Sequence, residues 1–482
     1  MSFKNTVLLL SVVLLVGCVL PPKESPHPAQ LASVGLTGAP AEPVPDGWWQ
    51  SFNDPQLDRL IRAGLKDSPT LAQAQARVAD ALAHSQIAQS KLLPSANLGA
   101  SALYQRGPEN YLFPPAQAGH TFWMGQAGAS LSWDLDFFGK QANAVHQAQA
   151  LTHSAELDLE NAKLMLSTAI ALAYVELYRE NALADIAERS AAQRENIVAI
   201  TRRRVAAGVD TQLELRQAEG QLPQAHVARD QAKAAADLAV HQLAELSGQG
   251  ADAYASIQRP VLNLDAALPV PTALPINLLA RRPDVLSARL QIAAADSQRL
   301  SDRAAFYPDI NLKGLAGIGA FGWSNLVQSS ALGFGAGPFI SLPLFDGGRL
   351  RAQYKSSEAQ LDGAIAGYND TVLRAVQQTA DQLTGIDALA RERLEQQQTL
   401  EANEAAYKLA EERYRAGLAS YLSVLNAETQ VLTARQTMVD IVANQAAARV
   451  TLLSAVGGSF DARSLGIETA PNSNQVLTRI TP

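Results

Sequence analysis

The side chains best able to do chemistry in this chain are two histidines and a few carboxylate pairs. His146 and His153 lie seven residues apart, which places both imidazoles on one face of a helix. A zinc site needs at least three protein ligands, and no third ligand stands near them in the sequence. The pairs Glu411-Glu412 and Asp134/Asp136 occupy helix surfaces or strand ends, where charged groups are usually solvated. We therefore predict no metal site, no cofactor and no enzymatic activity.

The only cysteine stands where a covalent modification is expected. Lys4 and the apolar run 7–16 precede Gly17-Cys18, a pattern typical of a secretory signal and too short to span a bilayer. This segment resembles a bacterial lipobox, in which the cysteine sulfur is diacylated and Cys18 becomes the first residue of the mature protein. Val19 follows where an aspartate would favour the inner membrane, so the resemblance implies an outer-membrane anchor. The alternative is an ordinary signal peptide with an incidental cysteine.

Composition and charge exclude several classes of protein. A net charge of −7 argues against binding to nucleic acid. Beyond the signal no stretch reaches eighteen apolar residues, so a helical membrane span is not expected and any membrane insertion must be by strands. About 465 residues remain after cleavage, which is enough for several domains or one elongated domain.

An internal repeat defines the structural unit of the chain. Four landmarks recur with their surroundings, since Pro69, Pro94, Gly139 and Gly208 return as Pro283, Pro308, Gly348 and Gly417. We therefore predict a signal peptide (1–17), a proline-rich lipid-anchored tether (18–47), an equatorial segment (48–68), a first repeat (69–250), a linker (251–282), a second repeat (283–457) and a C-terminal tail (458–482).

Two long stretches without proline predict very long helices. The stretches 139–203 and 348–412 are rich in Ala, Leu, Glu, Gln and Arg, which favour helix. Apolar residues recur seven apart within them, which is the spacing of a coiled coil. Each long helix forms an antiparallel hairpin with the helix that follows it. The other predicted helices are 70–93, 210–247, 284–305 and 420–456.

Between the helices, apolar and polar residues alternate, which predicts strands. Along 123–135, Gln126, Ser130, Ser132 and Asp134 oppose a face of apolar residues. Further strands are predicted at 96–104, 310–318 and 332–344. Four strands cannot close a barrel, so in a membrane they must be completed by other copies of the chain. The alternative is a soluble sheet that is buried on one face.

The segment Trp48 to Ile61, WWQSFNDPQLDRLI, closely resembles the opening signature of the NodT-type lipoprotein branch of the TolC-like outer-membrane factors. With the duplication, the match covers nearly the whole mature chain. The resemblance implies a mainly helical protomer with long antiparallel coiled-coil helices and four membrane β-strands. Three such protomers complete a 12-stranded β-barrel in the outer membrane and an α-helical barrel in the periplasm. Four predicted strands per copy agree with that number.

The resemblance also implies a function and a set of partners. The homotrimer would be a passive exit duct for drugs or other small toxic compounds. An inner-membrane pump, most often of the resistance-nodulation-division class, would deliver them through a periplasmic adaptor, the membrane fusion protein. One alternative is a duct for metal ions or secreted protein. Another is a lipid-anchored periplasmic coiled-coil structural protein that never spans the membrane.

The turns of the two hairpins carry the residues that the resemblance assigns to the periplasmic aperture and to the adaptor contact. Arg204 with Gly208, and Arg413 with Gly417, resemble the Arg-x-x-x-Gly turns through which family members meet the adaptor. Tyr414, Gly417, Ser423 and Asn426 match positions that line the constriction. Ser423 and Asn426 replace acidic residues that are common there, which argues against a cation-binding ring. The alternatives are helix caps for the glycines and ordinary packing or solvation for Tyr414 and Asn426.

Overall fold

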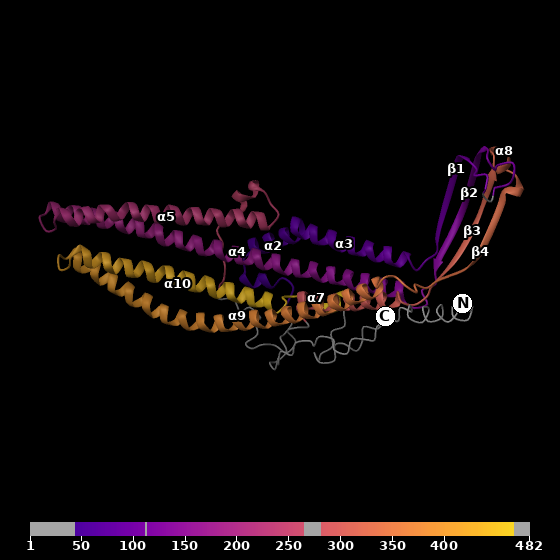
Figure 1. Ribbon diagram of the computed structural model, residues 1–482. Helices are drawn as coiled ribbons and strands as arrows, with labels where there is room; N and C mark the ends of the chain where they lie inside the picture. The colour runs from indigo at the N-terminus through magenta and orange to yellow at the C-terminus, as the bar shows by residue number, and fades with distance from the viewer. Residues whose placement is uncertain (1–43, 111–112, 265–280, 467–482) are drawn as a thin grey trace, which may run out of the picture. The chain divides into compact units, whose positions relative to one another are not determined.

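The computed structural model describes residues 44–110, 113–264 and 281–466, so the predicted signal and Cys18 lie outside the described residues. The chain divides into two compact units, of which the first contains 77–155 and 287–368 and the second contains the remaining described residues. In chain order the elements are η1 (Trp48–Phe52), α2 (Pro55–Asp67), α3 (Pro69–Ser90), β1 (Ser95–Arg106), β2 (Thr121–Asp134), α4 (Lys140–Ala206), α5 (Gln212–Leu246), η2 (Ala251–Ser256), α7 (Pro283–Ala304), β3 (Asp309–Phe321), α8 (Trp323–Leu326), η3 (Ser329–Ala331), β4 (Leu332–Ser341), α9 (Arg349–Arg415), α10 (Tyr421–Ala455) and η4 (Ala462–Leu465) (Figure 1).

The duplication is visible in the helix lengths. Helices α4 and α9 both have 67 residues, α5 and α10 both have 35, and α3 and α7 both have 22. At 1.5 Å per residue, α4 and α9 are each about 100 Å long. Figure 1 shows α5 running back along α4 and α10 running back along α9, as the two predicted hairpins require. Within the described ranges, no helix combines the length and the apolar character needed to cross a membrane.

Each long helix begins beside an aspartate that caps its first turn. Asp136 accepts hydrogen bonds from the backbone N–H groups of Gln141 (2.9 Å) and Ala142 (2.7 Å). Asp346 accepts them from Gly348 (3.0 Å) and Leu350 (2.9 Å). These N–H groups have no acceptor within the helix, so the carboxylates fix where α4 and α9 start.

The main core of the second unit is built around the segment that carries the family signature. Trp48, Phe52 and Ile61 are almost fully buried, and they belong to one cluster with Tyr174 of α4 and Leu243 of α5. Residues from α10 complete the cluster. The aromatic and aliphatic residues of the signature therefore hold helices from both repeats together.

The polar residues of the same signature form a buried network. Asp54 caps α2 by accepting from the backbone N–H of Gln56 (2.9 Å), and it also accepts from the Tyr174 hydroxyl (2.7 Å) and the Val261 N–H (2.9 Å). The Gln56 side chain donates to the Tyr174 hydroxyl and to the carbonyl of Gln258. Burial raises the pKa of Tyr174, so its hydroxyl remains a donor. The polar signature residues thus join α2 to α4 and to the segment after η2.

The four strands form one antiparallel sheet in the order β1-β2-β3-β4. Directly paired residues of antiparallel strands share a face, so the register defines two faces. The polar face consists mainly of serine, asparagine, glutamine and glycine, with Asp134, Asp309 and Lys313 as its charged residues. The apolar face consists mainly of alanine, leucine, isoleucine and tryptophan, and it includes Leu131 and Phe334. This arrangement confirms the predicted alternation in both copies.

The predicted strand at 332–344 is too long at its C-terminal end. Strand β4 ends at Ser341, which pairs with Asp309, the first residue of β3. Beyond this pair β4 has no neighbour within the described chain, and Pro343 has no N–H to continue the ladder. Leu342 and Leu344 therefore lie outside the strand. The weaker strand predicted at 96–104 is slightly longer than expected, at Ser95–Arg106.

A row of glycines crosses the polar face at directly paired positions, one on each strand, namely Gly99, Gly128, Gly317 and Gly333. A Cβ atom at Gly317 would lie 2.6 Å from the carbonyl oxygen of Ala127 and 2.7 Å from the Cα of Gly128. Contacts this short are not tolerated. Gly128 and Gly317 therefore allow β2 and β3 to lean toward each other on the polar face, which curves the sheet between them.

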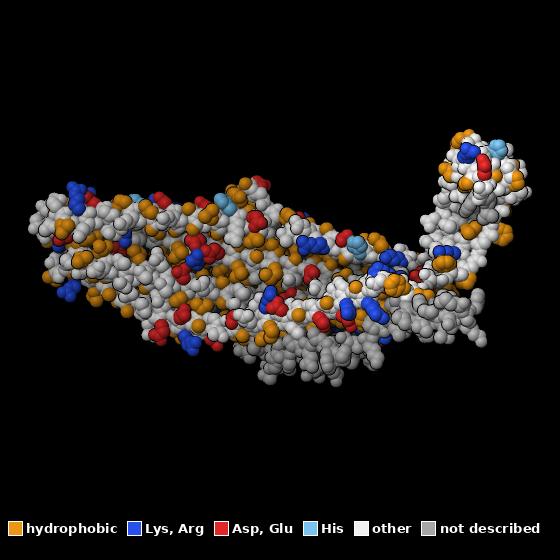
Figure 2. Space-filling view, viewed as in Figure 1, with side chains coloured by type: hydrophobic (Ala, Val, Ile, Leu, Met, Phe, Trp, Pro, Cys, Tyr) orange, Lys and Arg blue, Asp and Glu red, His pale blue; other side chains and the backbone are white. Residues whose placement is uncertain are grey.

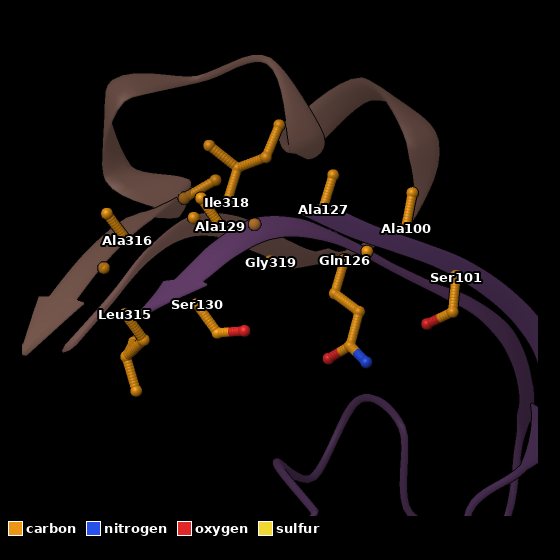
Figure 3. A pocket seen from close by; sticks show the side chains of 15 residues that line it. Ala100, Ser101, Gln126, Ala127, Ala129, Ser130, Leu315, Ala316, Ile318 and Gly319 are labelled. Carbon is orange, nitrogen blue, oxygen red and sulfur yellow. The ribbon is translucent and has the colours of Figure 1, made fainter. Parts of the chain in front are cut away.

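Figure 3 shows the centre of this curved sheet. The side chains of Ser101, Gln126 and Ser130 lie on one side of the strands, and those of Ala100 and Ala127 lie on the other. Residues at the glycine row line a hollow of about 760 Å³. The picture thus agrees with the two faces that the register defines.

A single copy leaves the sheet largely uncovered. Within the described residues its outer strands, β1 and β4, each have a neighbour on one edge only. Leu98 and Phe334 on the apolar face are 85% and 83% exposed. Figure 2 shows few charged side chains over the strands and many over the helices. Open edges and an exposed apolar face are features of a sheet that is completed by other molecules.

Candidate functional site at the hairpin turns

Both hairpin turns have the same backbone structure, which explains the repeated Arg-x-x-x-Gly spacing. The N–H of Val209 donates to the carbonyl of Arg204 (2.9 Å), and Gly208 has a φ of 73°. In the second hairpin the N–H of Leu418 donates to the carbonyl of Arg413 (2.8 Å), and Gly417 has a φ of 80°. This is the Schellman motif, in which a left-handed glycine ends a helix. The two glycines are thus helix caps.

The first turn is connected to the second through the side chain of Arg204. Its Nε and Nη2 atoms each donate to a carboxylate oxygen of Asp210 (both 2.8 Å). Its Nη1 atom donates to the carbonyl oxygen of Tyr414 (2.7 Å) near the C-terminus of α9. The guanidinium also lies over the Tyr414 ring, 4.4 Å from its centroid. A cation at a helix C-terminus is favourable, so Arg204 of one hairpin caps a helix of the other.

Tyr414 is the centre of this connection. Its side chain is fully buried. Its hydroxyl donates to Asp210 (2.7 Å) and forms a second hydrogen bond with the Thr201 hydroxyl (2.9 Å). Around the ring, Ile197, Val198, Ala218, Tyr421 and Val424 form a small apolar cluster from both hairpins. We call Thr201, Arg204, Asp210 and Tyr414 the turn network.

The electrostatics of the turn network favour its charged form. The hydrogen bonds from Arg204 hold the pKa of Asp210 below its ordinary value, although partial burial opposes this. The same pair raises the pKa of Arg204. Burial raises the pKa of Tyr414 to about 12, so at neutral pH the hydroxyl keeps the proton that it donates to Asp210.

A second ion pair joins the hairpins within the same unit. Arg194 of α4 lies 3.4 Å from Glu428 of α10 and also donates to the carbonyl of Gln221 in α5 (2.9 Å). The two charged side chains are 13% and 6% exposed. Burial raises the pKa of Glu428, and Arg194 only partly offsets this effect.

The structure places the predicted site residues in two groups. It brings Arg204 and Tyr414 together in the turn network. Arg413, Ser423 and Asn426 are exposed instead. The Ser423 hydroxyl lies 3.2 Å from that of Ser420, and within the described chain no ion pair involves Arg413. The residue equivalent to Asp210 in the second copy is Ala419, which leaves Arg413 without a carboxylate in its own turn.

Aliphatic side chains also remain exposed at both turns. Val209 and Leu213 of the first turn are 58% and 64% exposed, and the equivalent Leu418 and Leu422 are 71% and 56% exposed. The repeat thus presents the same pair of aliphatic residues twice. Their recurrence at equivalent positions makes these residues a candidate contact surface for another protein.

Sequence reasoning missed Asp210, Thr201 and Glu428. Asp210 was expected only as the start of a helix, whereas α5 is capped by Thr211 together with Glu214. A usable signal was the break in the repeat, because the residues equivalent to Asp210 and Tyr414 in the other copy are Ala419 and Val205, which cannot form these hydrogen bonds. In the described chain, no three histidine, cysteine or acidic side chains come close enough to hold a metal ion.

The chain is similar to outer-membrane proteins of several bacteria. The fusaric acid resistance protein FusA of Burkholderia cepacia is 36% identical over 360 residues, which cover 72% of this chain and 68% of FusA. The probable efflux pump outer membrane protein TtgC of Pseudomonas putida is 29% identical over 465 residues, which cover 94% and 95% of the two chains. The crystal structure of the outer membrane protein VceC from Vibrio cholerae matches with a TM-score of 0.82 at 33% identity, and it covers 87% of this chain and 100% of VceC.

A duplicated protomer with two long helical hairpins and a four-stranded sheet defines the TolC-like class of outer-membrane proteins. The family model described as outer membrane efflux protein matches residues 60–249 and 274–458, and the chain belongs to that family. This confirms the predicted TolC-like family and a mainly helical, duplicated protomer with few strands. It also confirms that the protein is not an enzyme.

Proposed function

We propose that three copies of this chain form the exit duct of a tripartite efflux system. The observation that carries the proposal is the four-stranded sheet, with one polar face, one apolar face and two open edges. Three sheets joined edge to edge supply twelve strands, and a closed barrel satisfies the open edges while its apolar face meets lipid. The polar face then lines the lumen.

The turn network is proposed to hold the periplasmic aperture closed. In each copy Arg204 and Asp210 of one hairpin hold Tyr414 of the other through two direct hydrogen bonds. An aperture closed by crowded hairpin ends opens when the hairpins separate, and separation breaks these bonds. Ser423 and Asn426 are exposed on α10 and are proposed to face the aperture.

The exposed residues at the turns are the proposed contact with a periplasmic adaptor. Val209, Leu213, Leu418 and Leu422 supply apolar area, and Arg413 supplies a cation without a carboxylate in its own turn. The adaptor would join the duct to an inner-membrane pump. Cys18 is the proposed lipid anchor in the outer membrane. The name of FusA supports small organic compounds as cargo.

Single-channel conductance in planar bilayers tests the proposal. The wild-type protein should conduct little, because the aperture is held closed, and the double variant Asp210→Ala/Tyr414→Phe should conduct several-fold more. The control is Arg202→Ala, which breaks the exposed Arg202–Glu219 pair within a single hairpin. That variant should behave like the wild type. A double variant with no more conductance than the control would contradict this role of the turn network, and no conductance in any variant would contradict the duct.

A further inference from the structure

The polar face of the sheet carries one cation, and its surroundings are unusual for such a face. Lys313 lies on β3 with its ammonium over the ring of Phe339 on β4, 4.1 Å from the ring centroid. Phe339 is 52% exposed on a face that otherwise consists largely of small polar residues and glycine. An exposed aromatic ring beside an exposed ammonium offers one apolar and one cationic contact to a solute.

The nearby carboxylates are engaged elsewhere. Asp309 accepts from the Asn311 side chain (2.8 Å) and lies 3.8 Å from the Lys140 ammonium. Asp134 accepts from the backbone N–H of Asp136 (3.0 Å) and from the Gln141 side chain (3.3 Å). No ion pair of Lys313 exists with any residue that the structure describes. The ammonium therefore keeps its capacity to bind an anion.

The wall beside Lys313 leaves space for an organic molecule. Gly337 is paired directly with Lys313, and Gly335 is paired directly with Leu315. A Cβ atom at either glycine would meet nothing within 4 Å. The polar face therefore has a strip of backbone without side chains at Gly335 and Gly337. This strip is bordered by Lys313, Phe339 and Leu315.

From the register of Lys313 to the far ends of the strands, the polar face carries no other formal charge among its described residues. The paired positions there are Ser, Asn, Gln, Gly or apolar residues, such as Ser132, Gln126 and Phe321. A molecule that moves along this part of the wall meets Lys313 as its only charged group.

We infer that Lys313 and Phe339 form an anion-selecting site on the lumen wall, three copies of which bind the carboxylate and the apolar body of organic anions such as aromatic carboxylates. The inference rests on the proposed duct, in which the polar face lines the lumen. Rings of cationic side chains select anions in pores, and the phenyl ring adds preference for an apolar body over a small inorganic ion.

Ion selectivity in planar bilayers tests the inference, with the Asp210→Ala/Tyr414→Phe background included so that the aperture does not mask the barrel. In a potassium chloride gradient, Lys313→Gln should lower the chloride-to-potassium permeability ratio by about two- to fivefold. Lys313→Arg should retain the ratio. Lys91→Gln, which removes a lysine outside the strands, should also leave it unchanged.

Benzoate and acetate serve as matched probes for the apolar contact. Benzoate should block the chloride current at about threefold lower concentration than acetate, and Phe339→Leu should reduce this difference without removing the chloride preference. A conducting duct with the same permeability ratio in Lys313→Gln as in wild type would overturn the inference alone. A wild-type protein and background variant that never conduct would overturn the proposed duct, and the inference with it.

Discussion

At the scale of single residues, Tyr414 contributes more than the sequence indicates. Its resemblance to family positions pointed to the constriction. The structure gives it a buried ring, two hydrogen bonds at the hydroxyl and a backbone carbonyl that accepts a hydrogen bond from Arg204. Its acceptor, Asp210, could not be predicted, because the contact joins residues 204 positions apart across two hairpins. Spacing along one helix gives no information about such a pair.

The turn network predicts a measurable coupling between Asp210 and Tyr414. Tyr414→Phe removes a buried hydroxyl and should lower the free energy of unfolding by about 1–3 kcal/mol. Asp210→Ala leaves Arg204 without its carboxylate and should cost about 3 kcal/mol. The double variant should lose less free energy of unfolding than the two single variants lose together, because both changes remove the same hydrogen bond. Denaturant unfolding of the purified protein measures the cycle, and strict additivity would contradict a shared bond.

Glu428 predicts a pH dependence with a definite sign. Burial raises its pKa above the ordinary 4.5, so the native state binds the proton more tightly than the unfolded state. The free energy of unfolding therefore falls as pH rises from 4.5 through the native pKa. Wild type should lose stability relative to Glu428→Gln over this interval, as measured by unfolding at several pH values.

Glu219 supplies a control of opposite sign. Hydrogen bonding to Arg202 lowers its pKa, so its contribution is present above the ordinary 4.5 and is lost as pH falls through the native pKa. The wild-type protein should therefore gain stability relative to Glu219→Gln as the pH rises. A stability difference between wild type and Glu428→Gln that does not change with pH would contradict the raised pKa of Glu428.

At the scale of elements, sequence patterns placed the helices within a few residues. Their ends follow from local chemistry that a sequence displays, such as the capping Asp136 and Asp346 and the left-handed Gly208 and Gly417. The strand alternation was also correct. The end of β4 was wrong because it depends on where β3 stops, and the register depends on pairing between distant segments.

The Schellman turns predict a local effect of substitution. Gly417→Val places a Cβ-branched residue at a φ of 80°, which should strain the turn by about 1–2 kcal/mol and weaken adaptor coupling while trimers still assemble. Gly385→Val, within α9 and with open space around it, is the matched control. Export assays with a cognate adaptor measure the coupling, and normal export by Gly417→Val would contradict the role of the turn.

The glycine row predicts a contrast between two glycines on the same face. Gly317→Ala should hinder sheet curvature, because its Cβ would lie 2.6 Å from a backbone oxygen, and it should reduce the yield of assembled protein. Gly335→Ala has open space and should change stability by only about 0.5 kcal/mol. Assembly is measured by the heat-modifiable fraction in mild detergent. Equal yields from the two variants would show that the row does not set the curvature.

At the scale of the whole molecule, one copy of the chain leaves its sheet incomplete. The sheet has open edges at β1 and β4 and an exposed apolar face, and family membership assigns the chain to outer membrane efflux proteins. Closure of a barrel from four strands per copy requires at least two copies, since eight strands is about the smallest barrel, and the proposed duct has three copies and twelve strands.

The most direct measurement is the mass of the protein extracted from outer membranes in mild detergent, with and without boiling. We predict a species of about three times the protomer mass that collapses to the monomer on heating, because the proposed duct closes its barrel from three sheets joined edge to edge. A monomer that leaves the membrane when the tether after Cys18 is cleaved would contradict the duct, since the lipid alone would then hold the protein in place.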